Sequence, residues 1–102
     1  MVVISTYNLT FPVETLLLLQ PTINQVVIRL PNIIQDSQMG TEILFYKTTG
    51  GNQNINVASG STNVILDTSQ ASLSYYTMTS TQSSVRFVAC KWTTGAYAWA
   101  IV

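Results

Sequence analysis

The side chains that most enzymes use for proton transfer and nucleophilic attack are scarce in this chain. It has no histidine, so Ser-His-Asp and Cys-His arrangements and the commonest transition-metal ligand are all missing. The single cysteine, Cys90, ends the apolar run Val88-Ala89-Cys90 and is expected to be a small buried residue. One cysteine without histidine leaves no ligand set for a structural zinc ion. We expect neither a metal nor a cofactor.

The carboxylates are equally few. A glycosidase holds two of them across a cleft, roughly 5 Å or 6.5–9.5 Å apart. No spacing along this chain brings two of the four together, and each is better interpreted as a turn or surface residue. No acidic run supplies a calcium site, and the glycine loops that bind phosphates or dinucleotides are absent. The sequence therefore favours a protein without catalysis. The four carboxylates are Glu14, Asp36, Glu42 and Asp67.

Recognition is the chemistry that the remaining side chains can support. A flat aromatic ring combined with planar amides, which both donate and accept hydrogen bonds, suits a neutral sugar. We expect Tyr97 and Trp99 to lie in the core. Trp92 precedes the turn Thr93-Thr94-Gly95 and is expected to be accessible. The amides that lie close together in the sequence are Asn52, Gln53, Asn54 and Asn56.

Two adjacent tyrosines, Tyr75 and Tyr76, complete the aromatic candidates. Neighbouring residues of a strand point to opposite faces, so one of the two rings is expected to be exposed. The predicted ligand-binding residues are therefore Tyr75, Tyr76, Trp92, Asn52 and Gln53.

The composition is unusually poor in charge. Charged residues make up 8% of the chain, whereas about 25% is typical. Ser, Thr, Asn and Gln together account for 38 of the 102 residues, and the net charge is zero. The four cations are scattered, so nothing attracts a nucleic-acid backbone, and near-zero charge opposes self-association little. The aliphatic run Leu16-Leu17-Leu18-Leu19 is far shorter than the ~20 residues of a membrane span, so we expect no membrane insertion.

β-Branched residues dominate, with 10 Val, 9 Ile and 14 Thr, and they favour the pleated sheet over the helix. Short apolar or alternating runs recur between turn residues, as in sandwiches and barrels. The polar stretch 58–84 keeps strand-like runs and therefore stays inside the fold, so residues 1–102 form one domain. Eight strands are predicted, over residues 15–20, 25–30, 41–48, 54–58, 63–67, 72–79, 84–92 and 96–102.

Turn residues predict how these strands connect. Gly50-Gly51-Asn52 is expected to close a hairpin between the third and fourth strands. Ser59-Gly60-Ser61 and Thr93-Thr94-Gly95 are expected to do the same for the next pair and the last pair. The predicted fold is therefore an antiparallel, jelly-roll-like β-sandwich.

The last predicted strand carries large side chains on one face and small ones on the other. Tyr97, Trp99 and Ile101 alternate with three alanines, and neither face is charged. The large face is expected to fill the core, while the small face allows a neighbouring chain to approach closely. An alternative is that the two sheets cover each other completely and leave no surface for association. The predicted oligomer interface consists of Ala96, Ala98 and Ala100.

Residues 25–102 resemble the distal domains of phage tail fibres and large-DNA-virus fibre proteins. The resemblance implies a homotrimer with many Thr and Asn residues and an outer end that contacts a glycan or protein receptor, located on the virion. It carries over no catalytic or binding motif. The segments that carry the resemblance are Ile28-Arg29-Leu30-Pro31-Asn32, 40–47, Gly50-Gly51-Asn52, Ile55-Asn56-Val57, 85–89 and 99–102.

The expected function is that of a trimeric fibre head that binds a host-surface receptor without catalysis. The receptor is expected to be a glycan. One alternative is a minor capsid or spike component that serves only for trimerisation. Another is a small cellular lectin. An enzyme is the least favoured class.

Overall fold

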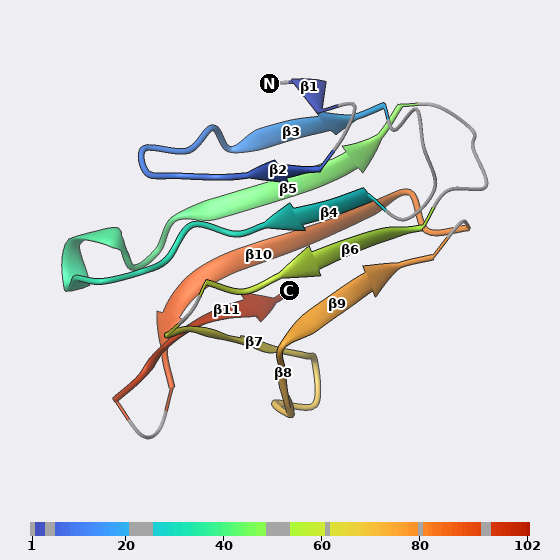
Figure 1. Cartoon of the computed structure of the whole chain (residues 1–102). Coiled ribbons are helices and arrows are strands. Elements are labelled where there is room, and N and C mark those ends of the chain that lie inside the picture. The colour runs from blue at the N-terminus through green and yellow to red at the C-terminus, as the bar shows by residue number, and fades with distance from the viewer. Residues whose placement is uncertain are drawn as a thin grey trace.

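A computed structural model describes residues 2–3, 6–20, 26–48, 54–60, 62–79, 81–92 and 95–102. The described strands form two sheets (Figure 1). The larger sheet has the order β1 (Val2–Val3), β3 (Leu16–Leu19), β5 (Glu42–Lys47), β10 (Ser84–Lys91), β11 (Tyr97–Ile101), β7 (Val64–Leu66) and β8 (Ser72–Leu73). The smaller sheet has the order β2 (Tyr7–Asn8), β4 (Val26–Arg29), β6 (Ile55–Ala58) and β9 (Tyr75–Met78). A short 3-10 turn, η1 (Asp36–Gln38), leads into β5.

The all-β fold with two facing sheets was predicted from the sequence and is confirmed. Each of the eight predicted ranges contains a strand. The range 72–79 holds two, because the chain bends at Ser74 and passes from the larger sheet (β8) to the smaller one (β9). The short strands β1 and β2 were not predicted, because two residues are too few to show a period.

The prediction of an antiparallel, jelly-roll-like arrangement was wrong. Five of the nine strand pairings among the described residues are parallel: β1–β3, β3–β5, β2–β4, β4–β6 and β7–β11. For all of these except β7–β11, the reason is that the chain crosses between the sheets at each step from β1 to β7. Every second strand therefore returns to the same sheet in the same direction, as the paired arrows of β3 with β5 and β4 with β6 show in Figure 1.

Two of the three predicted hairpins were wrong for the same reason. Strand β5 lies in the larger sheet and β6 in the smaller one, and β7 is again in the larger one, so neither pair of consecutive strands is hydrogen-bonded. Gly50-Gly51-Asn52 and Ser61 lie outside the described residues. The last hairpin is confirmed: β10 pairs with β11, and Gly95, at φ +83°, donates its N–H to the Trp92 carbonyl at 2.9 Å.

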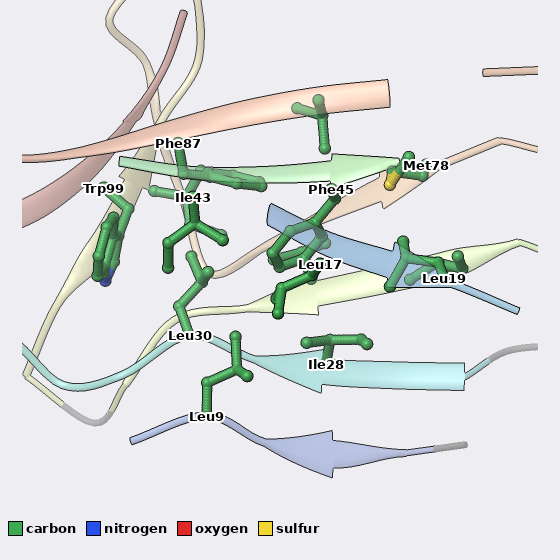
Figure 2. Packing of buried hydrophobic residues seen from close by; sticks show 14 of the residues in the cluster. Leu9, Leu17, Leu19, Ile28, Leu30, Ile43, Phe45, Met78, Phe87 and Trp99 are labelled. Carbon is green, nitrogen blue, oxygen red and sulfur yellow. The ribbon is translucent and has the colours of Figure 1, made fainter. Parts of the chain in front are cut away.

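The core fills the space between the two sheets (Figure 2). Alternate residues of each strand point inward, as period-two patterning requires. Phe45 and Phe87 meet edge to face with ring centroids 5.4 Å apart. Trp99 is fully buried, as predicted, and its Nε1–H donates to the Pro31 carbonyl at 2.9 Å. Tyr97 is only half-buried and packs at the margin of this core.

Side chains also hold the crossing segments in place. The Asn63 amide accepts from the Ile33 N–H at 2.6 Å and donates to the Ile33 carbonyl at 3.1 Å, and both residues are buried. Gly60 lies so close to Asn32 that an added Cβ would be 2.9 Å from the Asn32 Cα. The loops between the sheets are therefore fixed by specific contacts, which keeps both sheets in one orientation.

Candidate functional site

The outward face of the smaller sheet is polar and hollowed. Strands β4, β6 and β9 place Val27, Asn56 and Thr77 side by side in one cross-strand row, while Ala58 lies beside Tyr75 in the next row. The alternate residues of these strands, such as Ile28 and Val57, are buried in the core. The outward residues line an open groove of ≈ 470 Å³. Its lining consists of Val27, Asn54, Asn56, Ala58, Tyr75 and Thr77.

Hydrogen bonds fix the polar groups of this groove. The Thr77 hydroxyl donates to Asn56 Oδ1 at 2.8 Å, which leaves the Asn56 amide N–H groups directed away from Thr77. Arg29 is outward on the same strand as Val27, but its guanidinium donates to the Ser59 carbonyl at 2.8 Å. The groove therefore presents a fixed donor and a fixed acceptor and no charged lining residue.

The two adjacent tyrosines separate as predicted. Tyr75 is 59% exposed and lines the groove. Tyr76 points inward, where its ring meets Phe87 edge to face at 6.3 Å and its hydroxyl donates to Gln82 Oε1 at 2.8 Å. Tyr76 therefore packs against the core and does not join the groove.

Of the other predicted ligand-binding residues that the structure describes, Trp92 does not join this groove either. Trp92 is half-buried and lines a different hollow of ≈ 380 Å³ on the larger sheet, together with Leu66, Gln70 and Ala100. Asn52 and Gln53 lie outside the described residues. Of the three predicted residues that the structure describes, Tyr75 lines the groove, and Asn56 and Thr77 lie beside it there.

The outward face of the larger sheet is apolar. One cross-strand row contains Leu16 and Leu44, and the next contains Leu18 and Tyr46. Leu16 is 44% exposed and Tyr46 is 46% exposed. A further row carries Val88, Ala100 and Leu66 across β10, β11 and β7. The apolar face, as we call it here, comprises Leu16, Leu18, Leu44, Tyr46, Val88 and Ala100, whereas Leu66 is buried.

A single ion pair interrupts the apolar face. Arg86 Nη1 lies 3.4 Å from Glu42 Oε1, and both side chains are about half exposed. Cys90 is outward on the same strand as Val88, and burial raises the pKa of its thiol, so it stays neutral. The face therefore carries two charges that neutralise each other.

The three predicted interface alanines differ in exposure. Ala96 is exposed and Ala100 is half-buried, whereas Ala98 is fully covered within the chain. Ala98 therefore offers no surface to a neighbour. Leu44 was not among the predicted interface residues, although its signal was present: in Glu42-Ile43-Leu44-Phe45-Tyr46 both alternating sets are apolar apart from Glu42.

A second ion pair, with a tyrosine beside it, joins η1 to the β10–β11 hairpin at one end of the sandwich. Asp36 Oδ1 accepts from the Tyr97 hydroxyl at 2.5 Å and lies 2.9 Å from Lys91 Nζ. The hydrogen bond from Tyr97 and the contact with Lys91 lower the pKa of Asp36, while the same carboxylate raises the pKa of Lys91 and of Tyr97. The Asp36 and Lys91 side chains are largely exposed, so this end cluster ties η1 to the β10–β11 hairpin at the surface.

Asp67 has a structural role in a turn. Asp67 Oδ1 accepts from the Ser69 hydroxyl at 2.7 Å and from the N–H groups of Ala71 and Ser69, both at 2.9 Å, and these bonds, that of the hydroxyl first, lower its pKa. Asp67 is thus a turn residue, as predicted. Within the described ranges no three acidic or cysteine side chains gather as a metal site would require, and no helix there is long and apolar enough to cross a bilayer.

Neither a protein-family model, nor a curated protein, nor a solved structure matches this chain.

Proposed function

We propose that this chain is the head domain of a viral or phage fibre, which assembles as a homotrimer and binds a host-surface glycan without catalysis. The observation that carries the proposal is the contrast between its outer faces. The sandwich has one apolar face on the larger sheet and one polar, grooved face on the smaller sheet. A single rigid body with these two faces can associate through the first and present the second.

Association follows from the apolar face. Solvated leucines and Tyr46 on neighbouring strands form a patch of the kind that marks interfaces. Covering apolar area stabilises a contact by about 25 cal/mol per Å². The Glu42–Arg86 pair adds no net charge, so copies can approach without burying an unpaired ion.

A three-fold arrangement would also leave the polar, grooved face of each copy accessible to a ligand. Three copies whose apolar faces surround a common axis leave three smaller sheets pointing outward. The groove with Tyr75, Asn56 and Thr77 would then face solvent on every copy. These side chains offer an aromatic ring and hydrogen-bonding groups, which suit binding. They do not include the general acid and base that catalysis would use.

Light scattering of the native protein, followed by a glycan array, tests this function. The expected mass is three times that of the 11.2 kDa chain, and the expected array result is binding to host-type glycans. A monomer or a dimer would overturn the trimeric head. A trimer that binds no glycan and no host cell would instead support the purely structural capsid or spike component.

A further inference from the structure

We propose that the groove on β4, β6 and β9 is a subsite for one neutral sugar ring. Tyr75 stacks against this ring, and the Asn56–Thr77 pair forms hydrogen bonds with two adjacent hydroxyls of the sugar. This inference rests on the proposed glycan-binding function and specifies where and what the protein binds. It combines three features of the groove: an exposed ring, a fixed hydrogen-bonded pair and an uncharged lining.

The stacking platform is Tyr75. Its side chain is 59% exposed, although the next residue of the strand, Tyr76, packs against the core. The cross-strand neighbour of Tyr75 is Ala58, whose small side chain leaves the flank of the ring open. An accessible aromatic face next to a small residue suits the C–H face of a sugar, because such a face is apolar and flat.

The Asn56–Thr77 pair supplies matched polar groups. Because the Thr77 hydroxyl donates its hydrogen to Asn56 Oδ1, the Thr77 oxygen keeps lone pairs to accept with, and the Asn56 Nδ2 keeps hydrogens to donate. Two vicinal hydroxyls can use both groups at once, one accepting from Asn56 and the other donating to Thr77. The bond between Asn56 and Thr77 also fixes the amide orientation before any ligand arrives, which reduces the ordering cost of binding.

The spacing is that of one sugar unit. Tyr75 and Thr77 are two residues apart on the same face of β9, so their positions differ by about 6.6–6.8 Å. A single ring placed against Tyr75 therefore reaches the Asn56–Thr77 pair with its hydroxyl edge. Val27, beyond Asn56 in the same row, bounds the groove with an aliphatic wall.

The ligand class is neutral rather than acidic. No residue of the groove lining carries a charge. Arg29, the outward cation of β4, already donates to the Ser59 carbonyl, so it is not oriented for a sugar carboxylate. Burying an unpaired carboxylate against amide and hydroxyl groups would be costly, which disfavours sialylated glycans.

The test measures binding of the native assembly to neutral oligosaccharides and to their sialylated counterparts by ligand-observed NMR titration. Tyr75→Ala is expected to weaken neutral-sugar binding by about tenfold, while Tyr75→Phe keeps the ring and retains binding. Thr77→Val preserves the branched shape of the strand residue, removes its hydroxyl, and is expected to weaken binding several-fold. Tyr7→Ala is the matched control, because Tyr7 is 46% exposed and lies outside the groove.

The outcomes separate the two proposals. Equal binding by Tyr75→Ala and Tyr7→Ala, with the native protein still binding glycans, would overturn the groove as the subsite and leave the proposed function standing. Binding restricted to sialylated glycans would overturn the neutral class. Absence of any glycan binding by a correctly assembled native protein would overturn both the subsite and the glycan-receptor function. Light scattering and circular dichroism of each variant confirm that fold and mass are unchanged.

Discussion

The two outer faces of this sandwich are built from the same kinds of strand but have opposite chemistry. In β5 the outward residues after Glu42 are Leu44 and Tyr46, and in β6 they are Asn56 and Ala58. The core residues of the two strands, Ile43 and Phe45 in β5 and Ile55 and Val57 in β6, are fully buried. Inward positions therefore determine that the sheets pack together, while outward positions determine what each sheet meets.

This difference has an energetic consequence. Covering the leucines of the apolar face gains about 25 cal/mol per Å² and requires no replacement hydrogen bonds. Covering Asn56 or Thr77 removes water from polar groups and is unfavourable unless the incoming molecule offers its own donors and acceptors. The apolar face is thus suited to a second protein surface, and the grooved face to a ligand rich in hydroxyls.

The largest expected effect comes from placing the same charge on each face in turn. Leu44→Glu introduces a carboxylate in the middle of the apolar face, between Leu16 and Arg86 in the strand register. We expect it to dissociate the proposed trimer, because each interface would bury an added ion. Light scattering should show the mass falling from three chains to one.

Val27→Glu is the matched control for this variant. Val27 is also a half-buried aliphatic residue on the outward side of a strand, but on the smaller sheet. We expect its mass to stay that of the native assembly. A native mass for Leu44→Glu, or dissociation by Val27→Glu alone, would reverse the roles assigned to the two faces.

A second comparison sets an amide inside the sandwich against an amide on its surface. Asn63→Ala leaves the buried N–H and carbonyl of Ile33 without their side-chain partner. We expect a loss of about 2–4 kcal/mol in the free energy of unfolding. Asn56→Ala, on the solvated groove, is expected to cost less than about 1 kcal/mol. Urea unfolding at one fixed protein concentration measures both, since association shifts apparent stability. Equal costs would contradict the distinction between internal and outward positions.

Strand positions were predictable because their signal is local. Alternation in Asn54-Ile55-Asn56-Val57 matches the buried Ile55 and Val57, and the paired tyrosines required one exposed ring, which is that of Tyr75. Strand partners were not predictable, because a glycine-rich turn such as Gly50-Gly51-Asn52 is compatible with a hairpin and with a crossing between sheets. The choice between them depends on contacts distant in sequence, such as the bond from the Leu30 N–H to the Ala58 carbonyl at 2.8 Å.

The candidate site, like the fold, was predictable from the sequence only in its local features. Exposure of one ring from the Tyr75–Tyr76 pair followed from strand geometry alone. The separation of Trp92 from Tyr75 did not, because it depends on the assignment of β9 and β10 to different sheets. Thr77 was missed for a simpler reason: one threonine among 14 has no distinguishing sequence feature until its neighbour Asn56 is known.

The smallest expected effect concerns the end cluster, which belongs to neither face. The pKa of Asp36 lies below its ordinary value of 3.8, chiefly because the Tyr97 hydroxyl and then Lys91 bond to the carboxylate. Its stabilising contribution is therefore fully present above pH 3.8 and is lost as the pH falls through the lower value of the folded state. The pKa values of Lys91 and Tyr97 are raised, so their contributions are present below their ordinary values of 10.5 and 10.0 and are lost at higher pH.

Asp36→Asn should accordingly lower the midpoint of thermal unfolding slightly at neutral pH, and the difference from the native protein should vanish in acid. The effect is small because the Asp36 and Lys91 side chains are largely exposed and salt screens their attraction. A difference that persists unchanged in acid would show that the carboxylate charge is not its cause. The mass of Asp36→Asn at neutral pH should equal that of the native assembly, in contrast to Leu44→Glu, because a charge at the end of the sandwich lies outside the apolar face. Position on the sandwich, rather than charge itself, then determines whether a substitution affects assembly.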